Sequence, residues 1–125
     1  MQALLTDLYE LTMAAGFVAE GKQHDTATFE LFVRRLPGNR KFLIAAGLAQ
    51  ALEYLSALKF HAEEIAYLRA LPQFANAPDT FFEYLFNFRF TGDVFAVPEG
   101  TPIFPGEPML TVRAPIVEAQ IVETY

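Results

Sequence analysis

The sequence predicts an α+β fold, in which helices flank a mostly antiparallel sheet and residues 1–125 form one domain. Three observations lead there. Apolar residues at helical spacing recur through the first two thirds of the chain, an alternating strand interrupts them at 26–34, and a β-rich segment with frequent proline and glycine follows Gly92. A complete (β/α)₈ barrel is excluded, because it needs about 250 residues and the chain has 125.

The first predicted helix covers residues 5–20. Asp7 can cap it, and Glu10 stands three residues later as a capping-box partner. One apolar stripe keeps helical spacing: Leu4, Leu8, Leu11, Ala15 and Val18. A second apolar line lies on nearly the opposite side: Tyr9, Met13 and Gly16. We therefore expect this helix to be buried on both faces or to meet a second body, with Gly16 permitting a close approach.

The remaining elements follow from periodicity and from turn residues. A strand is expected at 26–34 and a turn at 37–39. Further helices are expected at 42–58, 62–71 and 79–88, the last capped by Asp79. After the change of composition we expect strands at 94–97 and 109–113 and a helical segment at 115–125. Residues 98–108 between the strands are expected to supply tight turns and edge positions.

The composition restricts the class of protein. Hydrophobic residues make up 53% of the chain and charged residues 19%, so we expect part of the apolar surface to belong to an interface or to a further domain. The formal net charge of −6 argues against a nucleic-acid partner. No cysteine is present, which excludes disulfides and thiolate sites and is compatible with the cytoplasm.

The sequence predicts neither a signal peptide nor a membrane span. Asp7 and Glu10 stand where a signal peptide would carry a basic region. The longest apolar stretch, 42–49, is far shorter than the about 18 residues that a membrane span requires. We therefore expect no membrane partner.

Few residues suggest chemistry by themselves. Neither His24 nor His61 has a convincing metal-ligand pattern, no phosphate-binding glycine motif occurs, and no catalytic residue is assigned. Four of the nine basic residues fall within eight positions, which suits a small anion: Arg34, Arg35, Arg40 and Lys41. Taken on spacing alone, a solvated turn is favoured over an anion site for these cations. Ordinary packing is likewise favoured over ligand stacking for Tyr9.

The segment 92–112 resembles the β-hammerhead of barrel-sandwich folds, which include lipoyl and biotinyl carrier domains. A carrier needs a lysine for its cofactor, and none of the three lysines falls in this stretch: Lys22, Lys41 and Lys59. A structural sheet with glycine and proline turns is therefore the better interpretation.

Several segments together resemble the N-terminal part of nicotinate phosphoribosyltransferases. They cover nearly the whole chain in order: LLTDLYELTMAAGF (4–17), FELFVRRLP (29–37), FLIAAGLAQALEYL (42–55), FRFTGDVFAVPEGTPIFPGEPMLTV (88–112) and APIVEAQIVET (114–124). The resemblance implies an α/β-hammerhead N-terminal domain that precedes an irregular α/β barrel. It implies an enzyme that makes nicotinate mononucleotide and pyrophosphate from nicotinate and phosphoribosyl pyrophosphate, with ATP hydrolysis and Mg²⁺, in the salvage synthesis of NAD.

The resemblance also implies roles for particular residues. Tyr9 matches the tyrosine that stacks on the pyridine ring from across a homodimer interface. Arg34 and Arg35 match a basic pair that lies near the phosphate of ligand or product. Thr6 and Asp7 are expected to hold Tyr9 in place. These matches replace the interpretations based on spacing alone, which were a solvated turn for the arginines and ordinary packing for Tyr9. Tyr9, Arg34 and Arg35 become the candidate substrate-binding residues.

The family's catalytic histidine and its phosphoribosyl-pyrophosphate site lie in the barrel, and neither His24 nor His61 matches that histidine. We therefore expect a chain that was cut before the barrel, that binds no cofactor or metal alone, and that is inactive alone. Two alternatives stay open: a non-catalytic dimerisation or regulatory module of the same fold, and a related nicotinamide- or quinolinate-using phosphoribosyltransferase.

Overall fold

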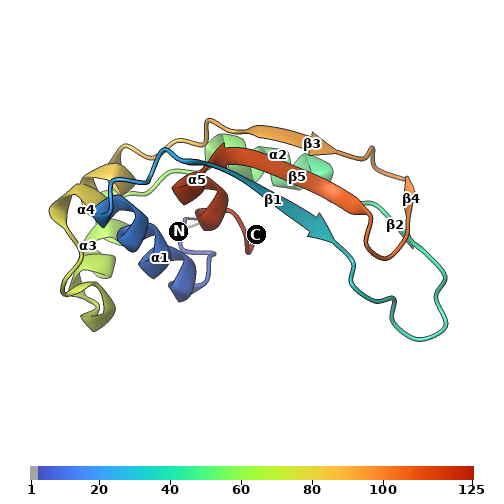
Figure 1. Cartoon of the computed structure of the whole chain (residues 1–125), viewed down its shortest axis with the longest axis horizontal. Helices are drawn as coiled ribbons and strands as arrows, with labels where there is room; N and C mark the ends of the chain where they lie inside the picture. The colour runs from blue at the N-terminus through green and yellow to red at the C-terminus, as the bar shows by residue number, and fades with distance from the viewer. Residues whose placement is uncertain (1–2) are drawn as a thin grey trace.

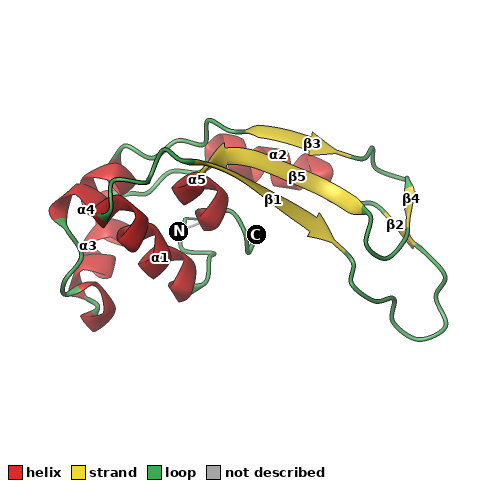
Figure 2. Cartoon of the chain, viewed as in Figure 1, coloured by secondary structure: helices red, strands yellow, loops and turns green. Residues whose placement is uncertain are grey.

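The structure, a computed structural model that describes residues 3–125, is α+β as predicted (Figures 1 and 2). Its helices are α1 (Leu8–Ala19), α2 (Leu48–Ala57), α3 (Ala62–Ala70), the 3₁₀ helix η1 (Pro72–Phe74), α4 (Asp79–Phe86) and α5 (Ile116–Ile121). Its strands are β1 (Thr26–Phe32), β2 (Leu43–Ile44), β3 (Asp93–Ala96), β4 (Pro102–Ile103) and β5 (Pro108–Pro115).

The molecule is elongated, with helices at one end and strands running toward the other (Figure 1). Helices α1, α3 and α4 gather at the helical end, and an antiparallel sheet of order β1-β5-β3 extends away from them. Strand β5 is central, because Val112 lies opposite Phe29 of β1 and opposite Val94 of β3. The short antiparallel pair β2-β4 stands at the far end.

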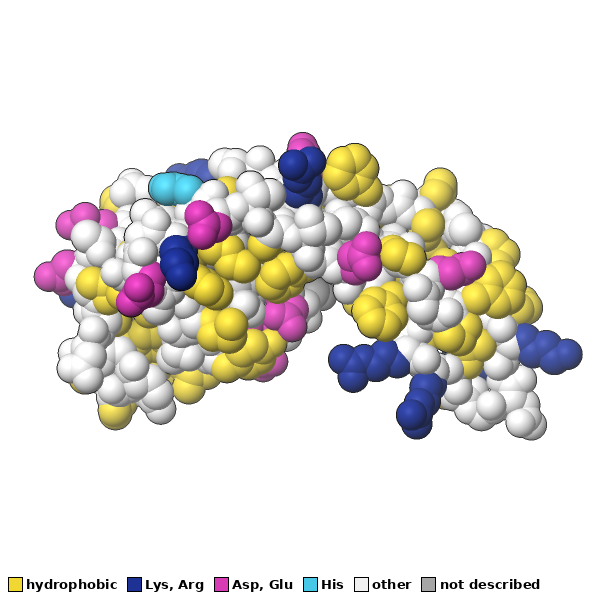
Figure 3. All heavy atoms as spheres, in the orientation of Figure 1, with side chains coloured by type: hydrophobic (Ala, Val, Ile, Leu, Met, Phe, Trp, Pro, Cys, Tyr) yellow, Lys and Arg dark blue, Asp and Glu magenta, His cyan; other side chains and the backbone are white. Residues whose placement is uncertain are grey.

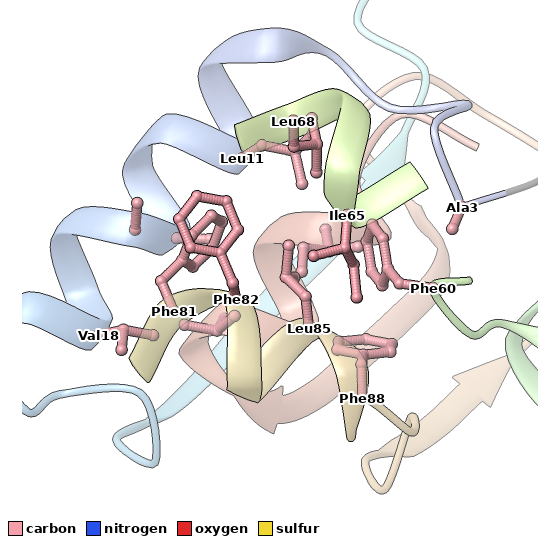
Figure 4. Packing of buried hydrophobic residues seen from close by; sticks show 14 of the residues in the cluster. Ala3, Leu11, Val18, Phe60, Ile65, Leu68, Phe81, Phe82, Leu85 and Phe88 are labelled. Carbon is pink, nitrogen blue, oxygen red and sulfur yellow. The ribbon is translucent and has the colours of Figure 1, made fainter. Parts of the chain in front are cut away.

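The main core lies among the helices (Figure 4). Phe81 and Leu85 of α4 are completely buried, and they share this core with Leu11 of α1 and Leu68 of α3. Phe81 stacks on Phe74 of η1 with ring centroids 5.8 Å apart. Each such side chain stabilises the fold by about 1.5–3 kcal/mol through removal of apolar surface from water.

A buried carboxylate joins the helical core to the sheet. Glu118 of α5 is 5% exposed and accepts hydrogen bonds from the backbone N–H and the hydroxyl of Thr91, at 2.6 and 2.9 Å. Thr91 lies in the connection that leads from α4 into β3. This contact fixes the entry of β3 into the sheet.

The predicted helix at 42–58 is wrong in its first part. Residues 43–44 form strand β2, which pairs with β4, and α2 begins only at Leu48. Gly47 precedes α2 with a φ of 100°, a left-handed conformation that glycine adopts without steric cost. Strand β4 falls in the segment 98–108, which was expected to supply tight turns and edge positions, and Ile103 is buried there as a partner of Leu43.

The prediction of a helix over 115–125 is also only partly right. Helix α5 ends at Ile121, and residues 122–125 leave it to lie beside the start of α1. The strand alternation predicted at 26–34 holds for Ala27 and Phe29, which are half-buried, but Leu31 is 56% exposed. No helix among residues 3–125 is long and apolar enough to span a membrane.

Candidate substrate-binding site

Tyr9 lies in the first turn of α1, which begins at Leu8 and not at residue 5, with the capping residues that the sequence predicted. Asp7 is the N-cap and forms a capping box with Glu10. The Tyr9 ring is 47% exposed, and its hydroxyl donates a hydrogen bond to Glu123 Oε1 at 2.9 Å. This bond, together with the nearby carboxylates, raises the pKa of Tyr9 to about 12. Tyr9 is therefore a neutral ring with one fixed end and an accessible face.

Arg34 and Arg35 follow the end of β1 in the loop that leads to β2. Both are exposed, and neither makes an ion pair or a hydrogen bond that its side chain donates among residues 3–125. Lysine and arginine side chains project from the molecule in the part that carries this loop (Figure 3). Arg34 borders a cavity beside the β1-β5 face, whereas Arg35 does not.

That cavity has a volume of about 590 Å³, which lies in the range of about 300–1,000 Å³ typical of small-molecule sites. Its walls come from the β1-β5 face, from α2 and from the segment after α5. Most of the lining on the sheet side is apolar, from Phe29, Leu31, Leu110 and Val112, although Glu30 of β1 also contributes. Arg34, Glu123 and Thr124 add polar groups from outside the strands. The structure thus brings Arg34 and the hydrogen-bond partner of Tyr9 to one hollow.

Two tyrosines stand at the α2 wall of the cavity. Tyr54 of α2 stacks on Tyr125 with ring centroids 3.8 Å apart and an interplanar angle of 7°. Tyr54 is 3% exposed, its hydroxyl has no hydrogen-bond partner among residues 3–125, and burial raises its pKa to about 12. A buried hydroxyl of this kind provides a donor for a group that enters the cavity.

A second buried carboxylate fixes the base of Tyr9. Glu10 is completely buried and accepts hydrogen bonds from the Thr6 hydroxyl, from the Asp7 backbone N–H at 3.1 Å and from the Thr124 hydroxyl at 2.6 Å. Burial raises the pKa of Glu10, and the bonds from Thr124 and Asp7 oppose that rise. The sequence predicted Glu10 only as a capping residue, and its contact with Thr124 joins the two ends of the chain.

Both histidines make contacts of the kind that support the fold. His61 is the N-cap of α3 and forms a capping box with Glu64. The ring of His24 lies 6.4 Å from that of Tyr84. Among residues 3–125, no group of three or more histidine and carboxylate side chains could hold a metal ion.

Comparison with known proteins decides the family. Residues 4–125 match the family model described as the nicotinate phosphoribosyltransferase (NAPRTase) N-terminal domain. The chain is 52% identical over 123 residues to nicotinate phosphoribosyltransferase pncB2 of Mycobacterium tuberculosis. The chain belongs to the NAPRTase N-terminal domain family. The sequence resemblance is thereby confirmed over the whole range that carried it.

The fold of this NAPRTase N-terminal domain matches a solved relative. The crystal structure of human nicotinic acid phosphoribosyltransferase superposes with a TM-score of 0.87 at 38% identity, over 97% of this chain and 24% of that one. The nicotinate phosphoribosyltransferase of Bos taurus is 42% identical over 126 residues, which is 97% of this chain and 22% of the relative. The match to the mycobacterial relative includes 98% of this chain and 26% of the relative. The chain therefore spans about a quarter of the length of such proteins.

Sequence reasoning missed three residues of this site: Tyr54, Glu123 and Thr124. Glu123 and Thr124 were assigned to a continuing helix, where no contact with α1 is foreseeable. Tyr54 fell within an apolar helical face and carried no distinguishing signal. The one available signal was the placement of a carboxylate, Glu10, beside apolar residues in a helix that was expected to be buried.

Proposed function

We propose that this chain supplies the N-terminal domain of an enzyme that transfers the phosphoribosyl group of phosphoribosyl pyrophosphate to nicotinate. The products are nicotinate mononucleotide and pyrophosphate, and the pathway is the cytoplasmic salvage synthesis of NAD. The family match over residues 4–125 carries this proposal. The names of the mycobacterial and bovine relatives support the same reaction.

In this proposal Tyr9 holds the pyridine ring and Arg34 and Arg35 bind phosphate. Transfer to the pyridine nitrogen passes through a cationic ribosyl-like transition state with a departing pyrophosphate, so the ring must lie edge-on to the anomeric carbon. A stacked tyrosine fixes the ring plane, and guanidinium groups match phosphate oxygens. The 47% exposure of Tyr9 supports contact with a second body, which we take to be the active site of the other subunit of a homodimer.

ATP hydrolysis with Mg²⁺ accompanies the reaction of the complete enzyme in this proposal. Residues 3–125 contain no group of three or more histidine and carboxylate side chains that could hold a metal ion, and we derive no step of that coupling from this chain. Its residues bind and orient ligands, and none of Tyr9, Arg34 and Arg35 needs to transfer a proton.

A chimeric enzyme tests the proposal. The 123 residues of the mycobacterial protein that match this chain are replaced by those of this chain, and nicotinate-dependent release of pyrophosphate is measured. We expect activity in the chimera and none in the 125-residue chain alone, since the chain has no assigned catalytic residue. Activity of the 125-residue chain alone, or an inactive but folded chimera, would contradict the proposal that this chain binds ligands and the rest of the enzyme supplies the catalytic residues.

Variants of the chimera test the residues. Tyr9→Ala is expected to raise the KM for nicotinate about tenfold through loss of ring stacking. Arg34→Ala is expected to raise the KM for phosphoribosyl pyrophosphate, and Arg35→Ala shows whether the second arginine, which lies outside the cavity, shares that role. Tyr67→Ala is the matched control, because Tyr67 of α3 is similarly exposed at 57%. Equal effects of the two tyrosine variants would remove Tyr9 from the site.

A further inference from the structure

The hydroxyl of Tyr9 is attached to an acceptor that is itself fixed. Glu123 Oε1 accepts the bond from Tyr9 at 2.9 Å, and Glu123 Oε2 accepts a bond from Gln120 Nε2 at 2.8 Å. Gln120 belongs to α5 and is 3% exposed. Both carboxylate oxygens are therefore engaged, so the direction of the acceptor is set by a buried amide rather than by solvent.

The two segments that the Tyr9–Glu123 bond connects are also held together by other hydrogen bonds. Glu10, next to Tyr9, accepts from the hydroxyl of Thr124, next to Glu123, at 2.6 Å. The hydroxyl of Thr6 lies 3.1 Å from the carbonyl oxygen of Ile121 at the end of α5. Figure 1 shows α1 and α5 side by side at this point. Two neighbouring residues of one segment thus contact two neighbouring residues of the other.

The outer of these two contacts is not needed to hold the segments together. The Glu10–Thr124 bond is at least partly buried, whereas the Tyr9–Glu123 bond is exposed to solvent. An exposed hydrogen bond contributes little to folding because water competes for both partners. What the outer bond does fix is the direction of the Tyr9 side chain, because it holds the hydroxyl at the far end of the ring. A phenolic O–H prefers to lie in the plane of its ring, so the position of the acceptor also favours one ring plane.

From this geometry we propose that Glu123 is a positioning residue that orients the Tyr9 ring for the substrate's pyridine ring. The inference rests on the proposed function, since it needs Tyr9 to contact that ring. A ring that is already oriented loses less conformational freedom on binding, so ligand affinity rises without a new ligand contact. Glu123 acts through Tyr9 and touches no reacting atom.

The contact itself is tested in the 125-residue chain, independently of activity. The pKa of Tyr9 is followed by the carbon-13 resonance of its Cζ atom. It is expected at about 12 in the parent chain, with Glu123, Glu10 and Asp7 as the carboxylates that face the phenol. Glu123→Ala removes the acceptor and its charge, so the pKa should fall toward that of a free tyrosine. Glu63→Ala, an exposed carboxylate of α3, is the control and should leave the pKa of Tyr9 unchanged.

The positioning role is tested in the chimera by separating KM from kcat. Glu123→Ala is expected to raise the KM for nicotinate about fivefold, as expected for loss of one hydrogen bond, while kcat changes less than twofold. Tyr9→Phe keeps the ring and removes the hydroxyl, so it should match Glu123→Ala. Because both variants remove the same bond, the double variant should be no worse than either one. Glu123→Gln keeps an acceptor oxygen and should recover most of the affinity.

The outcomes distinguish the two proposals. If Tyr9→Ala leaves the KM for nicotinate unchanged while the pKa shift is observed, the assignment of Tyr9 to the substrate fails and the inference fails with it. If Tyr9→Ala raises KM but Tyr9→Phe and Glu123→Ala do not, Tyr9 binds substrate and only the positioning inference is overturned. Additive effects of Tyr9→Phe and Glu123→Ala in the double variant would also overturn it. So would a lowered melting temperature that accompanies the loss of activity, because that would show a general structural role.

Discussion

At the scale of single residues, Glu10 combines two requirements that usually exclude each other. A carboxylate is costly to bury, yet Glu10 is completely buried because three donors surround it: the hydroxyls of Thr6 and Thr124 and the backbone N–H of Asp7. Burial favours the neutral form and is the largest influence on its pKa, which is raised. The free-energy cost of burying the Glu10 carboxylate is offset by its hydrogen bonds, one of which links the start of α1 to Thr124.

Substitution of Glu10 should change both stability and its dependence on pH. Glu10→Ala leaves buried donors without an acceptor and should lower the free energy of unfolding by about 1–3 kcal/mol. Glu10→Gln keeps one acceptor oxygen, and the hydroxyls can rotate to accept from its amide, so its cost at neutral pH should be smaller. Urea unfolding of the 125-residue chain measures both variants.

The sign of the pH effect follows from the raised pKa of Glu10. Between the usual glutamate pKa and the raised value, the folded state binds more protons than the unfolded state, so stability falls as pH rises through that window. Glu10→Gln should remove this component, and the control Glu63→Gln should not. An unchanged pH profile in Glu10→Gln would show that the carboxyl titrates normally in the folded chain.

At the scale of elements, the connection from α4 to β3 approaches strand β5 very closely at Gly92. A Cβ atom built on Gly92 would lie 2.4 Å from the Cβ of Ala114 and 2.8 Å from the carbonyl oxygen of Arg113. The neighbours are backbone and a short side chain, which cannot move aside. Absence of a side chain at position 92 is therefore a condition for β3 to reach the sheet.

Alanine at two glycines should have opposite effects on stability. Gly92→Ala should lower the free energy of unfolding by about 1–3 kcal/mol through overpacking. Gly16→Ala should raise it by about 0.5–1 kcal/mol, because Gly16 lies inside α1 and alanine is the better helix former. No atom of residues 3–125 outside the local helix lies within 4 Å of a Cβ built on Gly16, so a close approach at Gly16 would have to come from a second body. Equal changes in the two variants, measured by urea unfolding, would contradict the contacts at Gly92.

At the scale of the whole molecule, the high apolar content of the sequence includes many large hydrophobic side chains that are exposed to solvent. Large hydrophobic side chains are exposed along the sheet and on the helices, among them Leu31 at 56%, Phe95 at 62% and Phe86 at 60%. The cavity against the β1-β5 face adds an apolar hollow beside Arg34. Contiguous exposed apolar surface marks interaction sites, and the interface expected from the composition stays a prediction that these exposed side chains motivate.

The cavity should bind an anionic hydrophobic dye in the 125-residue chain. Leu31→Ser removes apolar surface from the cavity wall and should weaken dye binding at least about threefold. Phe86→Ser removes an equally exposed side chain of α4 that lies outside this cavity, and it should leave dye affinity unchanged. Fluorescence titration measures both, and equal losses would show that the dye reads scattered surface instead of the cavity.

The sequence alone determined the fold class, the family and most elements with clear periodicity. Helices α1 and α3 were predictable because capping residues and helical spacing are local signals. Strands β1, β3 and β5 were predictable for the same reason, since alternation and turn residues act over a few positions.

Only the tertiary structure decided what depends on distant pairing. Strand β2 exists because residues 102–103 lie beside it, although its own residues read as the start of a helix. The Tyr9–Glu123 and Glu10–Thr124 bonds each join residues 114 positions apart. The course of residues 122–125 brings Glu123 to Tyr9, and no local pattern specifies that course. A hydrogen bond between chain ends is decided by how the core packs, and for that reason the support of Tyr9 became visible only in three dimensions.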